Sequence, residues 1–129
     1  RAMSGKVNDK LRGLVFVGDD QEIFAEVVAA ILRSEDFDTR TFESGEEAVE
    51  EVERGAKPDI LLTDYVMPGM SGMELIIKCR TLLHGLKTVL FSGQVNDEIL
   101  SKYGVKPDRF IGKPFQPTVL LGLIQELRA

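Results

Sequence analysis

The sequence has little of the residues that build disulfide scaffolds and zinc sites: one cysteine, one histidine and no tryptophan in 129 residues. A lone Cys79 excludes a disulfide framework and a thiolate metal cluster. With His84 as the single imidazole, a zinc site of the usual kind cannot form. No apolar run is long enough to span a membrane and no signal peptide is visible, so we expect a cytoplasmic protein without a membrane partner.

Basic residues are also in the minority, with 16 Lys and Arg against 21 Asp and Glu. The net charge of −5 argues against direct binding of nucleic acid. The length suits one compact domain, and no internal repeat or interdomain linker is visible. Residues 1–10 are polar and lack periodicity, which predicts a flexible N-terminal lead-in followed by one domain over residues 11–129.

Five short runs of apolar or alternating residues predict strands. They are Leu14–Val17, Asp38–Phe42, the run Ile60, Leu61 and Leu62, then Thr88–Phe91 and Arg109–Ile111. The central run is apolar almost without a break, as in a strand buried on both faces of a parallel sheet. Asp38–Phe42 alternates weakly, which indicates a partly exposed edge strand.

Segments with helical periodicity lie between and after these strands. Ser44 with Glu47, and Ser71 with Glu74, have the spacing of capping boxes and predict two helix starts. Pro117 suits the first turn of a last helix. The expected inward faces are Phe24, Val27, Val28, Ile31 and Leu32; Ala48, Val49 and Val52; Leu75, Ile76, Cys79, Leu82 and Leu83; Ile99, Leu100 and Tyr103 of a short helix Asp97–Tyr103; and Leu120, Leu121, Ile124 and Leu127.

Strand and helix therefore alternate five times. Short crossovers of this kind require parallel strands and right-handed connections. The predicted fold is α/β, an open five-stranded parallel sheet, doubly wound with helices on both faces.

Polar residues follow the ends of four predicted strands: Asp19 and Asp20, Asp64, Ser92 and Lys113. In a parallel sheet these ends share one edge, where open α/β sheets bind their ligands. Three carboxylates in one cleft repel one another, so at least one should be partly protonated unless a cation is bound. Mg²⁺ prefers a few carboxylates together with water and phosphate oxygens.

This set of side chains suits phosphoryl transfer, which depends on positioning and charge neutralisation. Asp64 is the best candidate for a nucleophile that forms an aspartyl phosphate, because Asp19 and Asp20 are adjacent and better placed to hold metal. Taken singly, each residue has an ordinary structural role: the acid pair could cap a helix, Ser92 could serve a turn and Lys113 could be a surface lysine. The presence of suitable polar residues at all four strand ends together favours a phosphoryl-transfer site.

The pattern resembles the receiver domain of bacterial two-component response regulators, over roughly Leu11 to Arg128. The motifs that carry the resemblance are Asp19-Asp20, the segment DYVMPGMSG from Asp64, Ser92-Gly93, and KPF at Lys113–Phe115. The resemblance implies a flavodoxin- and CheY-like (βα)5 fold. Gly18-Asp19-Asp20-Gln21 can also be aligned with Gly18 in the first acid position, which would leave Asp19 as the main metal ligand with one acid missing; we prefer Asp19 and Asp20 as the pair.

The resemblance also implies roles for residues at the site. Asp64 is the phosphoacceptor, Ser92 and Lys113 contact the phosphate, and Phe110 is an aromatic switch residue. Pro114 is the candidate for a cis peptide bond. The implied Mg²⁺ ligands are Asp19, Asp20, Asp64 and the backbone carbonyl of Val66.

By resemblance, the chain is a phosphorylation-activated switch in a phosphorelay, a phosphoprotein that catalyses its own phosphorylation and dephosphorylation and is not a turnover enzyme. A histidine kinase or phosphotransfer protein would donate the phosphoryl group. The surface of the fourth helix, fifth strand and fifth helix would then engage an output domain, a protein partner or a second copy of the chain. The alternatives are a degenerate receiver acting as a phosphorylation-independent interaction module and, more remotely, an Mg²⁺-dependent phosphohydrolase, which would want a second acid where Val66 stands.

Overall fold

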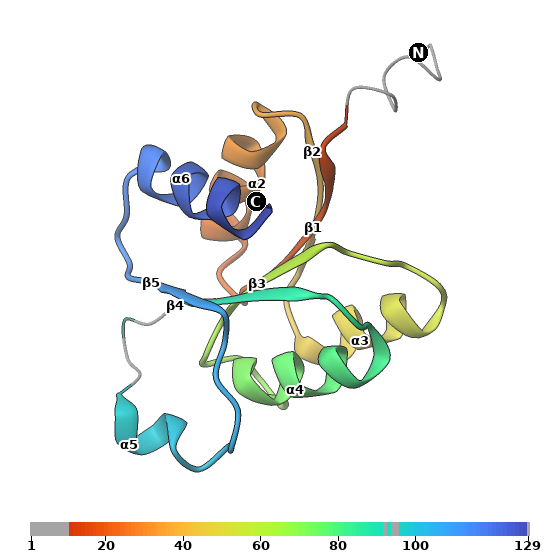
Figure 1. Cartoon of the computed structure of the whole chain (residues 1–129), viewed down its shortest axis with the longest axis vertical. Helices are drawn as coiled ribbons and strands as arrows, with labels where there is room; N and C mark the ends of the chain where they lie inside the picture. The colour runs from red at the N-terminus through yellow and green to blue at the C-terminus, as the bar shows by residue number, and fades with distance from the viewer. Residues whose placement is uncertain (1–10, 92, 94–95, 129) are drawn as a thin grey trace.

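The computed structural model describes residues 11–91, 93 and 96–128, and its centre is a parallel five-stranded sheet (Figure 1). The strands are β1 (Gly13–Gly18), β2 (Phe37–Phe42), β3 (Ile60–Asp64), β4 (Lys87–Phe91) and β5 (Arg109–Ile111). They lie in the order β2-β1-β3-β4-β5, and every neighbouring pair is parallel. The predicted open, doubly wound sheet is confirmed, with Asp38–Phe42 in the edge strand β2 as expected.

Helices cover both faces of the sheet, as Figure 1 shows. Helices α2 (Glu22–Arg33) and α6 (Pro117–Arg128) pack on one face. Helices α3 (Gly45–Glu53) and α4 (Gly72–Leu82) and the short α5 (Asp97–Leu100) pack on the other. In the part of the chain that the structure describes, no helix is long and apolar enough to cross a membrane.

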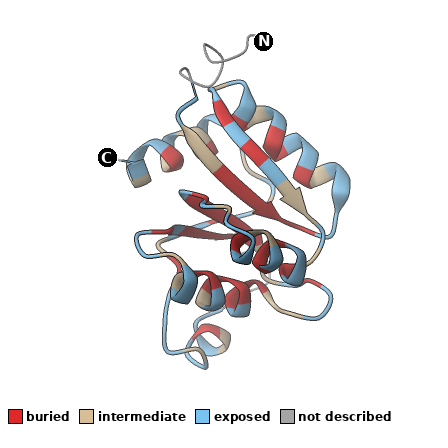
Figure 2. Cartoon of the chain, turned by 90° about the vertical axis from the view of Figure 1, so that its right-hand side faces the viewer, coloured by how far each residue is buried: buried red, intermediate tan, exposed pale blue. Residues whose placement is uncertain are grey.

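The core is divided in two by the alternation of side chains along each strand. Val15 and Val17 of β1 face α2 and α6, whereas Phe16 between them faces α3 and α4. All three are completely buried, because β1 is an interior strand with a layer of helices on each face. Edge strand β2 differs, with alternating buried and exposed residues at its start (Figure 2). The apolar run at Leu14–Val17 and the weak alternation at Asp38–Phe42 thus reflect a central and an edge position.

Both predicted capping boxes begin helices where expected. Ser71 accepts a hydrogen bond from the backbone N–H of Glu74, and the Glu74 carboxylate accepts one from Ser71 N–H at 2.8 Å, which completes the box. At α3, Ser44 accepts from Glu47 N–H at 3.3 Å, but the Glu47 carboxylate accepts from Glu43 N–H instead. Each cap satisfies N–H groups that the first turn of a helix leaves free.

Three expectations about the helices are wrong. Val27 is 53% exposed, because it lies about 100° around α2 from buried Val28. The side of α2 that packs inward is centred instead on Ala25, Val28, Ala29 and Leu32. Leu82 is 39% exposed at the last residue of α4, and the fourth predicted helix ends at Leu100 instead of Tyr103.

Candidate functional site

The acidic residues predicted from the strand ends meet at the carboxyl edge of the sheet. Asp64 is the last residue of β3, and Asp19 and Asp20 directly follow β1, its hydrogen-bonded neighbour. One carboxylate oxygen from each of the three lies within 4.8 Å of the others. Lys113, two residues after β5, reaches the same place. These four residues are separated by up to 94 positions in the chain, and the parallel sheet brings them together at one edge.

Asp19 is the most buried of the acids, with no exposed surface. Its Oδ2 accepts a hydrogen bond from Lys113 Nζ at 2.8 Å, and its Oδ1 accepts from Gln21 N–H at 2.9 Å. Asp20 is exposed on the solvent side of the cluster. The grouping of both acids with Asp64 agrees with the preferred alignment, in which Asp19 and Asp20 form the pair.

Asp64 is held by two donors. Its Oδ1 accepts from Tyr65 N–H at 2.9 Å, and its Oδ2 lies 3.4 Å from Lys113 Nζ. Burial raises the pKa of Asp64; the charge of Lys113 opposes this, the charge of Asp19 adds to it, and the net shift is upward. The ionised carboxylate of Asp64 is therefore held at an energetic cost, which a cation or a covalent bond to oxygen would relieve.

The donor set of this cluster fits Mg²⁺. Three carboxylates face one ammonium, so the cluster carries an excess of negative charge, and hard oxygen donors are what Mg²⁺ prefers. Val66, two residues after Asp64, has a side chain that is 60% exposed and lies in the loop before α4. Its backbone carbonyl as a further metal ligand stays a prediction.

Glycines allow the loop after Asp64 to fold closely against α4. Gly69 has a φ of +72°, in the left-handed region that glycine adopts without strain. Gly72 N–H donates to the Tyr65 carbonyl at 2.8 Å, and a Cβ on Gly72 would overlap the carbonyl oxygen of Asp64. The turn residues noted in the sequence therefore place the first turn of α4 directly against the backbone of Asp64 and Tyr65.

Two groups of aromatic residues near the site were not expected from the sequence. The Lys113 ammonium lies 4.1 Å from the centroid of the Phe24 ring, which the sequence analysis assigned only to the core. The hydroxyls of Tyr65 and Tyr103 are 2.8 Å apart, linking the loop after β3 to the turn after α5. No spacing in the sequence signals either contact, because each joins elements that are distant in the chain.

The remaining predicted site residues have mixed outcomes. Ser92 lies outside the described residues. The Lys113–Pro114 peptide bond is cis, as anticipated. Phe110 on β5 is 40% exposed, so its ring lies toward solvent and not in the core.

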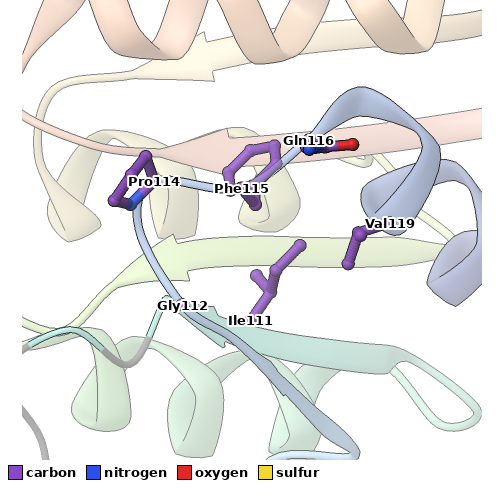
Figure 3. A pocket seen from close by; sticks show the side chains of 6 residues that line it. All are labelled: Ile111, Gly112, Pro114, Phe115, Gln116 and Val119. Carbon is purple, nitrogen blue, oxygen red and sulfur yellow. The ribbon is translucent and has the colours of Figure 1, made fainter.

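Two hollows lie near the carboxyl end of β5. One of about 270 Å³ is lined by Gln21, Asp64, Gly93 and Lys113, and among the three acids it reaches Asp64. A larger one of about 740 Å³ lies beyond Pro114, with Ile111 from β5 and Val119 from α6 along it (Figure 3). The larger hollow is mainly apolar and none of the acids lines it, whereas Asp64 and Lys113 line the smaller cleft.

Comparison with known proteins gives consistent matches along the chain. A family model described as "Response regulator receiver domain" matches residues 15–125. "DNA-binding response regulator MtrA" of Mycolicibacterium smegmatis is 30% identical over 120 residues, covering 91% of this chain and 51% of that protein. "Two-component response regulator ORR6" of Oryza sativa is 32% identical over 119 residues, covering 88% of this chain and 70% of that protein.

Among solved structures, chemotaxis response regulator CheY4 of Vibrio cholerae superposes with a TM-score of 0.78 at 23% identity. The match covers 88% of this chain and 97% of that one. At this identity the likeness supports the fold alone. The chain spans about half the length of the mycobacterial relatives it matches.

Proposed function

This chain belongs to the response regulator receiver domain family of two-component systems, and from that premise we propose that Asp64 is its phosphoacceptor. The observation that carries the proposal is the position of Asp64 at the end of β3, within 4.8 Å of two further acids and 3.4 Å from Lys113. A carboxylate in these surroundings is a nucleophile whose charge is unfavourable until it is shared or bonded.

The donor in this proposal is a phosphohistidine on a histidine kinase or phosphotransfer protein. An Asp64 carboxylate oxygen attacks phosphorus, the P–N bond breaks, and its electron pair returns to the imidazole of the donor. Lys113 Nζ lies between Asp19 and Asp64, where it can also pair with a phosphoryl oxygen. The domain thus promotes its own phosphorylation, and the later hydrolysis of the aspartyl phosphate, without acting as a turnover enzyme.

We further propose Mg²⁺ as the metal, held by Asp19, Asp20, Asp64 and the Val66 carbonyl. When bound, the ion would neutralise charge on the phosphoryl oxygens and on the acid cluster. Asp19 is fully buried and already paired to Lys113, so it is a fixed ligand; Asp20 is exposed and adjusts more freely.

Activation would spread from the site to the surface formed by α5, β5 and α6. The proposed route uses Ser92 and Lys113 as phosphate contacts and Phe110 as the residue that changes position. In the structure the ring of Phe110 is 40% exposed, so an inward turn would remove apolar surface from water. A change of this kind is a local charge event that biases a two-state element.

The output that this surface would control is a matter for the whole protein. The mycobacterial relatives are named as DNA-binding response regulators, and this chain covers 51% of them. For this chain we propose an output domain, a separate protein partner or a second copy of the chain as the recipient of the signal. Direct contact of the receiver itself with DNA is not expected from its net charge of −5.

The experiment is intact-protein mass spectrometry after incubation with acetyl phosphate and Mg²⁺. We expect one phosphoryl adduct on the wild type, none on Asp64→Asn, and an adduct on Asp108→Asn, a control acid at the opposite edge of the sheet. An adduct that persists in Asp64→Asn would overturn the assignment of the acceptor. No adduct on folded wild-type protein, together with no Mg²⁺ binding, would favour the phosphorylation-independent interaction module.

A further inference from the structure

Lys113 lies close to two aromatic rings as well as to two acids. Its ammonium is 4.1 Å from the centroid of Phe24 and 5.4 Å from that of Phe91. The same nitrogen is 2.8 Å from Asp19 Oδ2 and 3.4 Å from Asp64 Oδ2. The ammonium thus contacts two carboxylates and the face of one aromatic ring.

The Phe24 ring is itself held in place by two others. It meets Phe91 edge to face at 5.3 Å and Phe115 edge to face at 5.8 Å, while Phe91 and Phe115 stack at 5.9 Å. The three rings come from α2, from β4 and from the segment after β5. Perpendicular contacts on an aromatic ring are favourable and restrict its tilt.

A lysine on a flexible four-carbon stem gains little precision from one hydrogen bond. The negative face of an aromatic ring attracts a cation, most strongly where water is excluded. The Lys113 side chain is 22% exposed and Asp19 is not exposed at all, so this contact lies in a poorly solvated place.

We infer that Phe24 is a positioning residue for phosphoryl transfer, whose ring face holds the Lys113 ammonium beside Asp64. This inference rests on the proposed function of Asp64 and assigns to α2 a part in the chemistry of a lysine that follows β5. The simpler role for Phe24 is packing in the α2–α6 layer, to which it also contributes. If Phe24 positions the lysine, the effect of replacing Phe24 on the phosphorylation rate should depend on Lys113. If Phe24 only packs, that effect should not depend on Lys113.

The first test needs no variant and no phosphorylation. In a side-chain NMR spectrum of the wild type, the Cε protons and ammonium of Lys113 should be shifted upfield by the ring current, relative to exposed lysines such as Lys57 and Lys87. Resonances of Lys113 at ordinary positions would overturn the inference, even if Asp64 is phosphorylated normally.

The second test is the rate of adduct formation with acetyl phosphate and Mg²⁺, followed by intact mass. Phe24→Leu should lower the rate of adduct formation about three- to tenfold. Phe24→Tyr keeps the ring, and its rate should stay within about twofold of the wild-type rate. The control Phe115→Leu removes a ring of the same cluster that does not face the ammonium, and it should also stay within about twofold.

The deciding measurement is the double-mutant cycle with Lys113→Ala. If Phe24 acts through the lysine, adding Phe24→Leu to Lys113→Ala should change the remaining rate by less than about twofold. An equal slowing in both backgrounds would show a packing role only and overturn the inference. A wild type that forms no adduct would instead contradict the proposed function, while the NMR result would still decide the position of the ring.

Discussion

The amino and carboxyl edges of the sheet carry clusters of charged side chains that differ in charge balance. At the amino ends, Arg80, Thr88 and Asp108 form what we call the amino-edge cluster, with one positive and one negative charge. Asp108 Oδ2 accepts from Thr88 N–H at 2.7 Å, from Thr88 Oγ1 at 3.1 Å and from Arg80 at 3.2 Å. At the carboxyl ends, three acids share one lysine.

The pKa shifts of the two clusters are opposite. Burial alone would raise the pKa of Asp108, but the hydrogen bonds from Thr88 and the contacts with Arg80 outweigh it and lower the pKa. For Asp64, burial and the neighbouring Asp19 prevail over Lys113, and the pKa is raised. The amino-edge cluster, in which the charges are balanced, stabilises the fold. The acid cluster, in which negative charge is in excess, favours binding of a cation or a phosphoryl group.

The largest expected effect on stability comes from neutralising the charge of the three acids with Mg²⁺. Saturating Mg²⁺, at about 100 times its dissociation constant, should raise the free energy of unfolding of the wild type by about 3 kcal/mol. Urea denaturation with and without Mg²⁺ measures this. The gain should remain in Asp108→Asn and be largely lost in Asp64→Asn; an equal gain in both variants would show that the ion binds elsewhere.

Breaking the amino-edge cluster should have the next largest effect. Asp108→Asn should lower the free energy of unfolding by about 2 kcal/mol at pH 7, because the charged acceptor of three hydrogen bonds is lost. The folded pKa of Asp108 lies below its ordinary value of 3.8. The stability that ionised Asp108 contributes is therefore fully present above pH 3.8 and is lost as the pH falls through the folded pKa. The difference in unfolding free energy between wild type and variant, measured by urea denaturation, should narrow as the pH falls below 3.8. A gap that stays constant with pH would contradict the assigned role of the charge.

An Asp-to-Asn substitution at the carboxyl edge should change the free energy of unfolding in the opposite direction. Without Mg²⁺ at pH 7, Asp64→Asn should raise the free energy of unfolding by about 1 kcal/mol, because it removes one of three repelling charges. Because the folded pKa of Asp64 is raised, the ionised carboxylate destabilises the wild type fully above the folded pKa and not at all below 3.8. The higher stability of Asp64→Asn should therefore disappear in acid. Destabilisation by Asp64→Asn at pH 7 would refute the idea of stored charge repulsion.

The smallest effect is expected for the uncharged contact between Tyr65 and Tyr103. A double-mutant cycle with Phe at both positions should give a coupling of about 0.5–1 kcal/mol in unfolding free energy. The hydrogen bond to Tyr103, followed by burial, raises the pKa of Tyr65 to about 12. In Tyr103→Phe the pKa of Tyr65, measured by absorbance titration, should fall toward 10; no change would show that the hydroxyls are not bonded in solution.

The sequence predicted the sheet well, together with the meeting of Asp19, Asp20 and Asp64 at its carboxyl edge, since both depend on local patterns. The apolar run at Ile60 identified a central strand, and Asp64 at its end needed only the parallel arrangement to reach Asp19 and Asp20. The inward face of α2 was misjudged at Val27, because a valine extends the apolar pattern beyond the side that the sheet covers. The amino-edge cluster and the ring of Phe24 could not be foreseen, since their side chains meet only after three elements have packed.

The contact of Gly72 with the backbone of Asp64 has a consequence for sequence variation. Main chain meets main chain there, so no change of side-chain rotamer can make room for a larger residue. In a library of all single substitutions, every replacement of Gly72 should therefore be depleted, including alanine, whereas Gly93 and Gly122, with open space around them, should accept many. A residue beside the proposed acceptor can thus be tightly restricted although it contributes no functional group.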